Sequence, residues 1–585
     1  MHAAPPISIA PSGASVQPSA ATVQPSLVRL LRTARHIAPA QLAARAGFML
    51  QRRLYTLAPD RPILAARRAA AGAVAVRTLP VLPFDLVAPE GREILCRRAA
   101  ALARGRFAYL GREADFSAGV RWDDPHASPL WAFNLQYLGA VLELALADHA
   151  SEAQQLLAAW AAEFGARWDR VAWHPYPVSL RLANLCFAAG HLGGFDGLGC
   201  GALDLAATHA AYLLNHLEHD LRGNHLLENA FALLVAATHL NGPLAARCGA
   251  AARMLLTTEI PEQVRADGSH FELSPMYHLI VLQRCLQGLA LLERDDPLAQ
   301  QVLAPAVARM ADFLAGILCP DGDIPPIGDA VRGFAPPPRT LLALAERLAG
   351  ARAARSAEAV TSFPDAGLYV LRSRRLWAIF DAGPVCVDYL PGHGQADSLT
   401  VEVWCDGACI VGDPGVHEYT GAERAWGRSS RSHSTMTVDD ADTSEVYGSF
   451  RVGGRARIVS VRPAADAVTA ALEPFGVRGR LTRTVRVSGE RLEIADSATV
   501  PTGRTVRSRL HLHPAVHIVE VPGACERVVI ARSAAGLVRI EAEQPLQVER
   551  GRASRQYGLI EPTTIIVQPL VTGAARFSIV PLAAA

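Results

Sequence analysis

The apolar periodicity of this chain changes once, near residue 361. From about residue 92 to 350, apolar residues recur every three or four positions, as in "LWAFNLQYLGAVLELALADH" and "LIVLQRCLQGLALLER", which is the spacing of amphipathic helices. Beyond that point, segments such as "AGLYVLRS" and "RLTRTVRVSGERLEIADSATV" alternate polar and apolar residues between Gly-containing turns. Helices and strands need different side-chain periods, so the chain has to fold into a helical part followed by a β part.

The order of these elements predicts an architecture. Many successive helices without strands between them favour a helical toroid or solenoid, and the lack of a fixed repeat weakens a short-repeat solenoid. The long alternating region favours stacked antiparallel sheets. We therefore expect an N-terminal (α/α) toroid at residues 91–355 and a C-terminal antiparallel β-sandwich at residues 356–585. The functional site should lie where the two parts meet.

Two segments precede the helical part. Residues 1–25 are rich in Pro, Ser and Ala, which predicts a disordered leader. Residues 26–90 begin with the Arg-rich stretch "LVRLLRTARHIAPAQLAARAGFMLQRRLY", which predicts a helical extension. This extension would either pack on the main helical part, which we favour, or contact a membrane surface.

Composition excludes several function classes. All 57 basic residues are Arg, so a P-loop Lys and a Schiff-base Lys are both excluded. A formal net charge of +2 without a basic tract gives no support for a nucleic-acid partner. The sequence shows no apolar run of membrane-spanning length and no signal-peptide pattern. We expect a cytoplasmic protein, with the periplasm as the alternative, and the oligomeric state stays open.

One helix carries an unusual number of polar groups. "RGNHLLENA" places Asn224, His225 and Glu228 on one helix at three- and four-residue spacing. If that helix is buried, each unpaired polar group would cost about 1–3 kcal/mol. These residues either form a buried structural network or line a cavity, and the sequence leaves both readings open.

Other segments of the helical part supply further candidates. "DGSHFELSPMYH" contains His270 and Tyr277 at an expected turn-to-helix junction. "WHPYPVSLRLAN" contains Trp173, Tyr176 and Arg181. Aromatic rings stack on sugars and guanidinium groups bind carboxylates, but each residue taken alone is more often part of a core or of a structural network.

The β part contributes polar residues beside Gly-containing turns. "GHGQADSLTVEV" contains His393 and Asp397, and "VGDPGVHEY" contains Asp413. "RSSRSHSTMTVDD" contains Arg428 and His433. An isolated His or Arg in a strand-rich region is more often structural than functional, so these residues gain weight only as a set.

The ordered set of these motifs, with "PDGDIPPIGD" and "FPDAGLYVLRS" between them, resembles the heparinase II/III-type polysaccharide lyases. The resemblance covers roughly residues 90–460 and implies an (α/α) toroid followed by antiparallel β-sheets. It also implies β-elimination on an acidic polysaccharide or oligosaccharide that contains uronic acid. That reaction removes the proton α to the carboxylate and expels the 4-linked oxygen, so it needs a group that neutralises the carboxylate, a base and an acid.

The resemblance assigns these roles to particular residues. Asn224 and His225 would hold the substrate carboxylate, and Glu228 would orient His225. Tyr277 would be the acid to the leaving oxygen and the base on one substrate epimer, and His393 would be the other base candidate. The predicted substrate contacts are Glu228, Trp173, Tyr176, Arg181, His270 and Arg428.

The sequence departs from the family pattern at a metal site. Several relatives hold zinc with a second His two residues after the one that matches His393, together with an Asp and a later His. Gln395 stands at that position here, while Asp413 and His433 match the other two ligands. Zinc prefers imidazole, thiolate or carboxylate ligands to an amide. We therefore expect no bound zinc and no other cofactor.

Two other functions remain open at this stage. The chain could be a non-catalytic carbohydrate-binding protein that handles an exopolysaccharide. It could also be a glycoside hydrolase, which needs two carboxylates roughly 5–10 Å apart across the bond. The sequence does not identify the polymer or distinguish endo from exo action. The carboxylates available to a hydrolase are Glu228, Glu272, Asp329 and Asp397.

Overall fold

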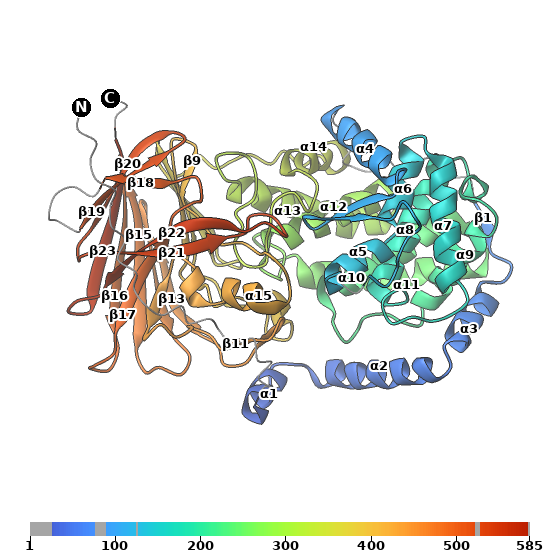
Figure 1. Ribbon diagram of the computed structural model, residues 1–585, viewed down its shortest axis with the longest axis horizontal. Coiled ribbons are helices and arrows are strands. Elements are labelled where there is room, and N and C mark those ends of the chain that lie inside the picture. Colours follow the sequence, from blue (N-terminus) through green and yellow to red (C-terminus); the bar gives the residue numbers. More distant parts are fainter. Residues whose placement is uncertain (1–25, 77–88, 125–126, 521–526, 583–585) are drawn as a thin grey trace.

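The computed structural model describes residues 26–76, 89–124, 127–520 and 527–582. A helical part and a β part lie next to each other along the long axis (Figure 1). The prediction of helices followed by antiparallel strands is therefore confirmed. The predicted leader, residues 1–25, lies outside the described residues.

Three helices form the N-terminal extension and run along the lower edge of Figure 1, from the β part to the helical part. Arg32 forms an ion pair with Glu445 in the β part, with 3.1 Å between Nη1 and Oε1. Gln41 donates a hydrogen bond of 3.0 Å to the carbonyl of Asp220 in the helical part. The extension therefore packs against both parts. Its helices are α1 (Leu27–Ala34), α2 (Pro39–Leu57) and α3 (Asp60–Ala70).

The helical part begins with α4 and ends with α14. Proline stands in the first turn of several helices, where its missing N–H would have had no partner in the helix. The helices are α4 (Pro89–Leu102), α5 (Pro129–Gln136), α6 (Gly139–Leu146), α7 (Ala150–Phe164), α8 (Pro175–His191), α9 (Ala202–Leu213), α10 (Gly223–His239), α11 (Pro243–Gln263), α12 (Pro275–Leu291), α13 (Ala304–Ile317) and α14 (Pro338–Ala349), with the short turns η2 (Phe195–Leu198) and η3 (Ala299–Leu303).

The expectation of a strand-free helical part is wrong at two places. β2 (Arg106–Tyr109) and β3 (Arg112–Asp115) form a hairpin, and β4 (Leu240–Asn241) pairs with β1 (Val74–Ala75) from the extension. Strands of two to four residues are too short to show a period of two in the sequence.

α10 is the most enclosed helix near the site. Leu226, Leu227, Ala230 and Leu233 are all at most 1% exposed. Every residue from 226 to 236 is buried, so α10 has no solvent-facing side over this stretch. Polar residues at its N-terminus must therefore bind other protein groups or face a cavity.

Three antiparallel sheets dominate the described residues of the β part. In the eight-stranded sheet the last strand of the chain, β23, lies between β16 and β20. The five-stranded sheet contains β5 (Val360–Phe363), β6 (Leu368–Arg372), β7 (Leu376–Asp381), β8 (Val401–Cys405) and β9 (Ala408–Val411). The four-stranded sheet contains β10 (Met436–Val438), β17 (Val506–His511), β22 (Glu561–Pro569) and β21 (Gln547–Ala553). The eight-stranded sheet runs in the order β13 (Arg457–Pro463), β14 (Ala467–Glu473), β15 (Arg480–Ser488), β16 (Arg491–Thr499), β23 (Ala574–Pro581), β20 (Gly536–Ala542), β19 (Val528–Ser533) and β18 (His517–Glu520).

Short elements connect these sheets on the side that faces the helical part. They position His393 and the residues that surround it. They are η4 (Pro391–His393), α15 (Gly421–Gly427), η5 (Ser430–Ser432), β11 (Val446–Tyr447) and β12 (Arg451–Val452).

An apolar cluster joins the two parts. Phe313 and Ile317 of α13 pack with Leu368, Ile379 and Trp404 of the five-stranded sheet. Burial of such side chains stabilises their contact by about 1.5–3 kcal/mol each, which fixes the helical part against the sheet. Across the described ranges, the structure contains no helix long and apolar enough to cross a lipid bilayer.

Candidate active site

A cavity of about 340 Å³ lies between the helical part and the β part. All four residues predicted to be catalytic line it: Asn224, His225, Tyr277 and His393. The structure thus brings together side chains that are up to 169 positions apart in the chain. The remaining polar lining comes from Tyr137, His174, Tyr176, Tyr419 and Tyr557.

Asn224 is placed by an unusual start to α10. Gly223 has φ 56°, and a Cβ atom at this position would lie 2.3 Å from Oε1 of Glu272. The glycine lets Glu272 approach, so that its carboxylate accepts hydrogen bonds from the Asn224 backbone N–H at 2.6 Å and from Nδ2 at 2.8 Å. The Asn224 Oδ1 atom is left without a partner. Because Glu272 already binds the amide donor, the free atom of Asn224 suits a hydroxyl or protonated carboxyl better than an ionised carboxylate.

His225 is held by a buried carboxylate on the loop before α10. Its Nδ1 atom lies 2.9 Å from Oε1 of Glu218, whose other oxygen accepts a hydrogen bond from Asn229. Burial lowers the pKa of His225, but the Glu218 carboxylate outweighs this and raises the pKa above its ordinary value. The Tyr176 ring packs against the imidazole at 4.4 Å between centroids. The shift favours the protonated, positively charged form of His225 at the cavity wall.

Glu228 does not orient His225, which corrects the prediction. Its two carboxylate oxygens each accept a hydrogen bond of 2.8 Å from Nε of Arg284 on α12. Glu228 is buried and does not line the cavity. The Glu228–Arg284 pair joins α10 to α12. The carboxylate that orients His225 is that of Glu218.

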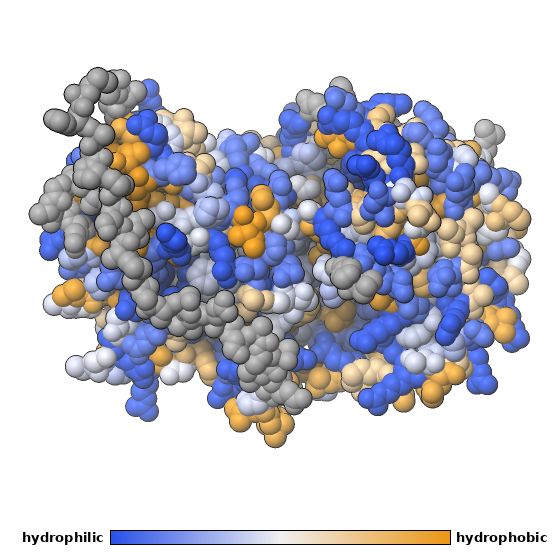
Figure 2. Space-filling model, viewed as in Figure 1, coloured by the Kyte–Doolittle hydropathy of each residue, from blue (hydrophilic) through white to orange (hydrophobic). Residues whose placement is uncertain are grey.

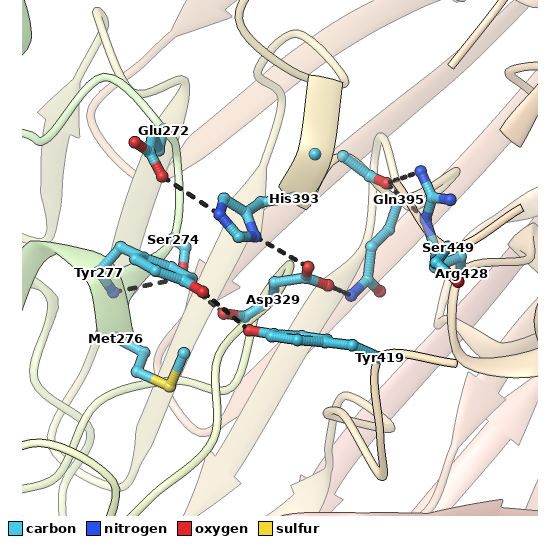
Figure 3. A network of polar contacts seen from close by, with 12 residues as sticks. Glu272, Ser274, Met276, Tyr277, Asp329, His393, Gln395, Tyr419, Arg428 and Ser449 are labelled. Carbon is cyan, nitrogen blue, oxygen red and sulfur yellow. Dashed lines mark hydrogen bonds and ion pairs between the residues drawn. The ribbon is translucent and has the colours of Figure 1, made fainter. Parts of the chain in front are cut away.

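Tyr277 lies in the first turn of α12 and projects into the cavity. Ser274 begins this helix by accepting a hydrogen bond from the Tyr277 N–H at 3.4 Å. The Tyr277 hydroxyl lies 3.1 Å from that of Tyr419, which in turn accepts a hydrogen bond of 2.7 Å from Tyr557 (Figure 3 shows the first of these contacts). Burial raises the pKa of Tyr277 well above its ordinary value, so the phenol keeps its proton in the free protein.

His393 lies between two carboxylates (Figure 3). Nδ1 is 3.0 Å from Oδ2 of Asp329, and Nε2 is 3.2 Å from Oε2 of Glu272. Burial lowers the pKa of His393, but these hydrogen bonds and charges raise it to about 9. His393 is therefore protonated at neutral pH, and it can act as the predicted base only in its neutral form. The imidazole ring packs on the Tyr277 ring at 4.0 Å between centroids.

The two carboxylates beside His393 stay ionised. Burial raises the pKa of Glu272, but His393 and Asn224 lower it to about 2. Asp329 likewise has its pKa held far below the ordinary value, because Arg424 and His393 outweigh burial. Arg424 binds both Asp329 oxygens from α15. Both carboxylates are thus occupied by structural partners.

Two predicted substrate-binding arginines are buried away from the cavity. Arg181 donates hydrogen bonds to the carbonyls of Gln136 and Ala172, at 2.6 and 2.7 Å. Arg428 donates to the carbonyl of Gly394 at 2.8 Å. Each side chain is at most 1% exposed. Both predictions are corrected, because these guanidinium groups bind carbonyls inside the fold.

Trp173 and His270 are also structural. Trp173 is fully buried and stacks on His209 with 4.9 Å between ring centroids. His270 is 1% exposed and its Nε2 atom lies 3.1 Å from Oε1 of Gln263. Of the predicted substrate contacts, Tyr176 alone lines the cavity. An aromatic or polar residue in a helix-rich sequence does not reveal which side of its helix faces the ligand.

Several site residues were missed by the sequence analysis. Tyr419 lies in "GDPGVHEY", a motif from which only Asp413 is a candidate by sequence. Glu218 lies seven positions before His225, across the break that starts α10, so helical spacing does not connect them. Phe334 and Phe450 come from loops and form part of the apolar wall. Their sequence neighbourhoods carry no signal for a binding site.

The residues matching the zinc ligands of relatives do not form such a site. His433 directs Nδ1 at Oδ2 of Asp413, 2.9 Å away. Gln395 donates its amide N–H to Asp329 at 2.8 Å, so it takes part in the His393 network instead. Within the described ranges, no group of three or more His, Cys, Asp or Glu residues is arranged to hold a metal. The donor set therefore does not fit zinc.

Comparisons with known proteins agree with this architecture. The "Heparinase II/III N-terminus" domain matches residues 196–335, and the "Heparinase II/III-like, C-terminal" domain matches residues 355–580. Together they cover more than half of the chain and meet at the change from helices to strands.

Two curated relatives are similar in sequence. A heparin-sulfate lyase of Pedobacter heparinus is 27% identical over 319 residues, which is 46% of this chain and 45% of the relative. A heparin-sulfate lyase of Bacteroides stercoris is 25% identical over 268 residues, which is 40% of this chain and 39% of the relative. The matched region thus spans less than half the length of either relative.

Solved structures show the same fold over most of the chain. A crystal structure of heparinase III has a TM-score of 0.69 at 16% identity, covering 94% of this chain and 92% of its own. A heparan sulfate lyase from Pedobacter heparinus has a TM-score of 0.59 at 20% identity, covering 89% and 88%. The Streptomyces coelicolor chondroitin AC lyase in complex with chondroitin sulphate has a TM-score of 0.53 at 14% identity, covering 90% and 83%.

Proposed function

The chain belongs to the heparinase II/III-like family, and from this premise we propose that it is a polysaccharide lyase that cleaves uronic-acid chains by β-elimination. One observation supports this most. A phenol and an imidazolium, from Tyr277 and His393, face each other at 4.0 Å in the cavity between the two parts, beside the positively charged His225. β-Elimination needs proton transfer next to a neutralised carboxylate, and these are the groups present.

The proposed reaction uses the residues in the following way. His225 binds the carboxylate of the uronate and supplies the positive charge, and the free Oδ1 of Asn224 accepts a hydrogen bond from a hydroxyl group of the sugar. The proton α to the carboxylate leaves with a base, the electrons form the new C=C bond, and the bond to the 4-linked oxygen breaks. On one substrate epimer Tyr277 first loses its proton to solvent; its phenolate then takes the α proton and passes it to the 4-linked oxygen. On the other epimer the neutral imidazole of His393 takes the α proton, and Tyr277 donates its own proton to that oxygen.

His393 has two proposed roles that depend on pH. At neutral pH the imidazolium lies against the Tyr277 ring, where its charge favours phenolate formation during proton transfer. Above its pKa of about 9, the neutral imidazole can accept the α proton from the other epimer. The neighbouring carboxylates of Glu272 and Asp329 hold the ring in place in both cases.

The two alternative functions have less support. A glycoside hydrolase needs two carboxylates facing the bond, but Glu228, Glu272, Asp329 and Asp397 are all buried and none of them lines the cavity. A binding protein without turnover would not need the Tyr277–His393 contact. Binding without product in the test below would support this non-catalytic function.

The test follows near-ultraviolet absorbance during incubation with a panel of uronate polysaccharides, including bacterial exopolysaccharides. β-Elimination leaves a conjugated uronyl end that absorbs, whereas hydrolysis does not. The Tyr277→Phe and His393→Ala variants are compared with the parent, and Tyr369→Phe, in the five-stranded sheet, is the matched control. A rise abolished in the first two and kept in the control supports the proposal.

Other outcomes would separate the alternatives. New reducing ends without absorbance would indicate a hydrolase. Binding without either product would indicate a non-catalytic protein, and a rise that both variants retain would keep the reaction but reject this site. We also propose that the helices close as an (α/α) toroid, that the sheets stack as a sandwich and that the site works without zinc or another cofactor.

A further inference from the structure

The cavity has no surplus positive charge. Among the described residues that line it there is no Arg, and His174 is neutral because burial lowers its pKa to about 4. The cationic side chains in the lining are His225 and His393. His225 is held by Glu218, and His393 lies between Glu272 and Asp329, of which Asp329 also binds Arg424. Three cations are thus balanced by three carboxylates. The cations are His225, His393 and Arg424, and the carboxylates are those of Glu218, Glu272 and Asp329.

The neighbouring cavity does not supply free cations either. It has a volume of about 350 Å³ and shares Phe334 and Tyr557 with the candidate site. It contains Arg98 and Arg332, but Arg98 forms an ion pair with Glu143 and Arg332 with Asp321, each at 2.5 Å. Sulfate groups are bound mainly by charged hydrogen bonds from Arg or Lys, and this wall has none to spare.

Apolar side chains make up much of the remaining wall. They come from both parts of the fold and surround the Tyr277–His393 pair. Such a wall favours substituents without charge, for example acetyl or methyl groups, because burying them in contact with aromatic rings contributes about 0.8 kcal/mol per carbon. The residues concerned are Leu130, Phe133, Ile280, Phe334, Leu390 and Phe450.

We propose that the substrate is an unsulfated uronate polymer whose sugars next to the scissile bond carry neutral, apolar substituents such as O-acetyl groups. This inference rests on the proposed lyase function. It is carried by the lack of unpaired cations among the described residues that line the cavity and by the apolar wall around the reacting groups. The site then has one place for an anion, the uronate itself at His225.

The test compares polymers that differ in one substituent. Heparan sulfate is compared with its chemically desulfated form, and an O-acetylated bacterial uronate polymer with its deacetylated form. We expect kcat/KM to be at least tenfold higher for desulfated heparan than for heparan sulfate, and at least tenfold higher for the acetylated polymer than for its deacetylated form. Equal or better cleavage of the sulfated form would overturn the inference while leaving the lyase function intact.

Binding provides a second measurement if no polymer is cleaved. Oligosaccharides from the same pairs are titrated calorimetrically into Tyr277→Phe, which keeps the cavity shape. Tighter binding of the sulfated form, or no binding of any form, would overturn the inference. Phe450→Arg places a new cation at the cavity rim and should raise activity or affinity toward the sulfated form, whereas Phe450→Leu, the uncharged control, should not.

A separate observation concerns α1 and α2, which are oriented with their apolar sides outward. Leu27, Leu50 and Leu57 are 71%, 60% and 82% exposed. The polar side chains of the same helices face the protein, as in the hydrogen bonds of Gln41 to Asp220 and of Tyr55 to His216. Among the described residues, ten of the 21 exposed large apolar side chains lie between residues 27 and 64.

The outward side of this extension is also basic. Six arginines are exposed between residues 26 and 70, against one exposed acidic residue, Asp60. In Figure 2 hydrophobic side chains gather at the lower edge of the molecule, where Figure 1 places α1. Apolar side chains flanked by Arg are the features of a helix that lies in the headgroup region of an anionic bilayer. The exposed arginines are Arg29, Arg35, Arg53, Arg61, Arg67 and Arg68, of which Arg29 also pairs with Glu445.

We infer that the outward side of α1 and α2 binds the surface of an anionic lipid bilayer. A second copy of the chain is a poorer fit, because a two-fold contact through this side would place the arginines of both copies near each other. The polar inward contacts stay intact in this arrangement. The helices would then lie flat on the bilayer with the rest of the protein above it.

The test is flotation of the full chain with vesicles of phosphatidylcholine, with and without phosphatidylglycerol. We expect the parent to float with the anionic vesicles and the Leu50→Gln/Leu54→Gln variant to bind about tenfold less. Met254→Gln changes an equally exposed apolar residue on α11 and should bind as the parent does. Equal binding to neutral vesicles, or no flotation, would overturn the inference. A dimer lost in the double variant would assign the surface to a second copy.

Discussion

The ring of Tyr277 lies 4.0 Å from the ring of His393, with an angle of 32° between their planes. Tyr277 belongs to α12 of the helical part and His393 to η4 of the β part. The contact therefore forms only when the two parts are docked. It places a positive charge against the phenol that is proposed to transfer protons, so the geometry of the junction controls the chemistry.

The charge on His393 should make stability depend on pH. Its pKa is raised from 6.5 to about 9 in the folded protein, so the stabilisation is fully present below pH 6.5 and is lost as the pH rises through about 9. Urea unfolding of the parent and of His393→Gln should show a stability difference that is larger at pH 6 than at pH 9.5, by about 3 kcal/mol as an upper bound. A difference independent of pH would contradict the imidazolium assignment.

Replacing Glu218 should affect substrate binding more than it affects stability. In Glu218→Gln, His225 loses the carboxylate that raises its pKa, so the imidazole becomes neutral and holds the uronate less well. We expect KM to rise about tenfold with a smaller change in kcat. The measurement is the initial rate of product absorbance as a function of substrate concentration.

Glu228→Gln is the matched comparison for that experiment. It leaves Arg284 without its buried carboxylate partner, which typically costs about 3–5 kcal/mol of stability. KM should stay close to that of the parent at temperatures where the variant is folded. If Glu228→Gln raises KM as Glu218→Gln does, the assignment of His225 to Glu218 is incorrect.

Gly223→Ala should damage the site by displacing Glu272. The added Cβ would lie 2.3 Å from Glu272 Oε1 and at a positive φ, so Glu272 must move away from Asn224. We expect a loss of about 1–3 kcal/mol in stability and at least tenfold in kcat/KM. Gly242→Ala, also at positive φ but with no atom within 4 Å of the new Cβ, should lose stability by backbone strain and keep its activity.

Metal removal should have no effect on the protein. Gln395 donates a hydrogen bond to Asp329, and Asp413 contacts His433, so each of the three matching side chains already binds another protein group. Dialysis against a chelator should leave both Tm and activity unchanged, and added zinc should not raise Tm. A Tm that falls on chelation and recovers with zinc would contradict the expectation.

The change of periodicity near residue 361 was sufficient to predict the helical and β parts, because each extends over many elements. The hairpin β2–β3 was not predictable, since its strands have four residues each. The convergence of Asn224, His225, Tyr277 and His393 followed from their motifs taken as an ordered set. No single helix or strand would have indicated it.

Most of the site predictions that were wrong concerned side chains whose binding partners lie far away in the sequence. Glu228 and His225 are three positions apart, but the carboxylate binds Arg284, 56 positions away. Arg181 and Arg428 looked like anion-binding groups, yet both bind carbonyls inside the fold. A sequence gives the spacing along a helix, whereas burial and charge at a position depend on elements that pack on it from elsewhere.

The position of β23 has a consequence for how the protein is made. Residues 574–581 pair with β16 on one side and β20 on the other, so they join the two halves of the eight-stranded sheet. β13 to β16 can assemble as soon as they leave the ribosome, but the sheet stays divided until residues 574–581 have followed them. During that interval the facing edges of β16 and β20 have unpaired backbone groups, which can pair with the edge of a strand from another chain.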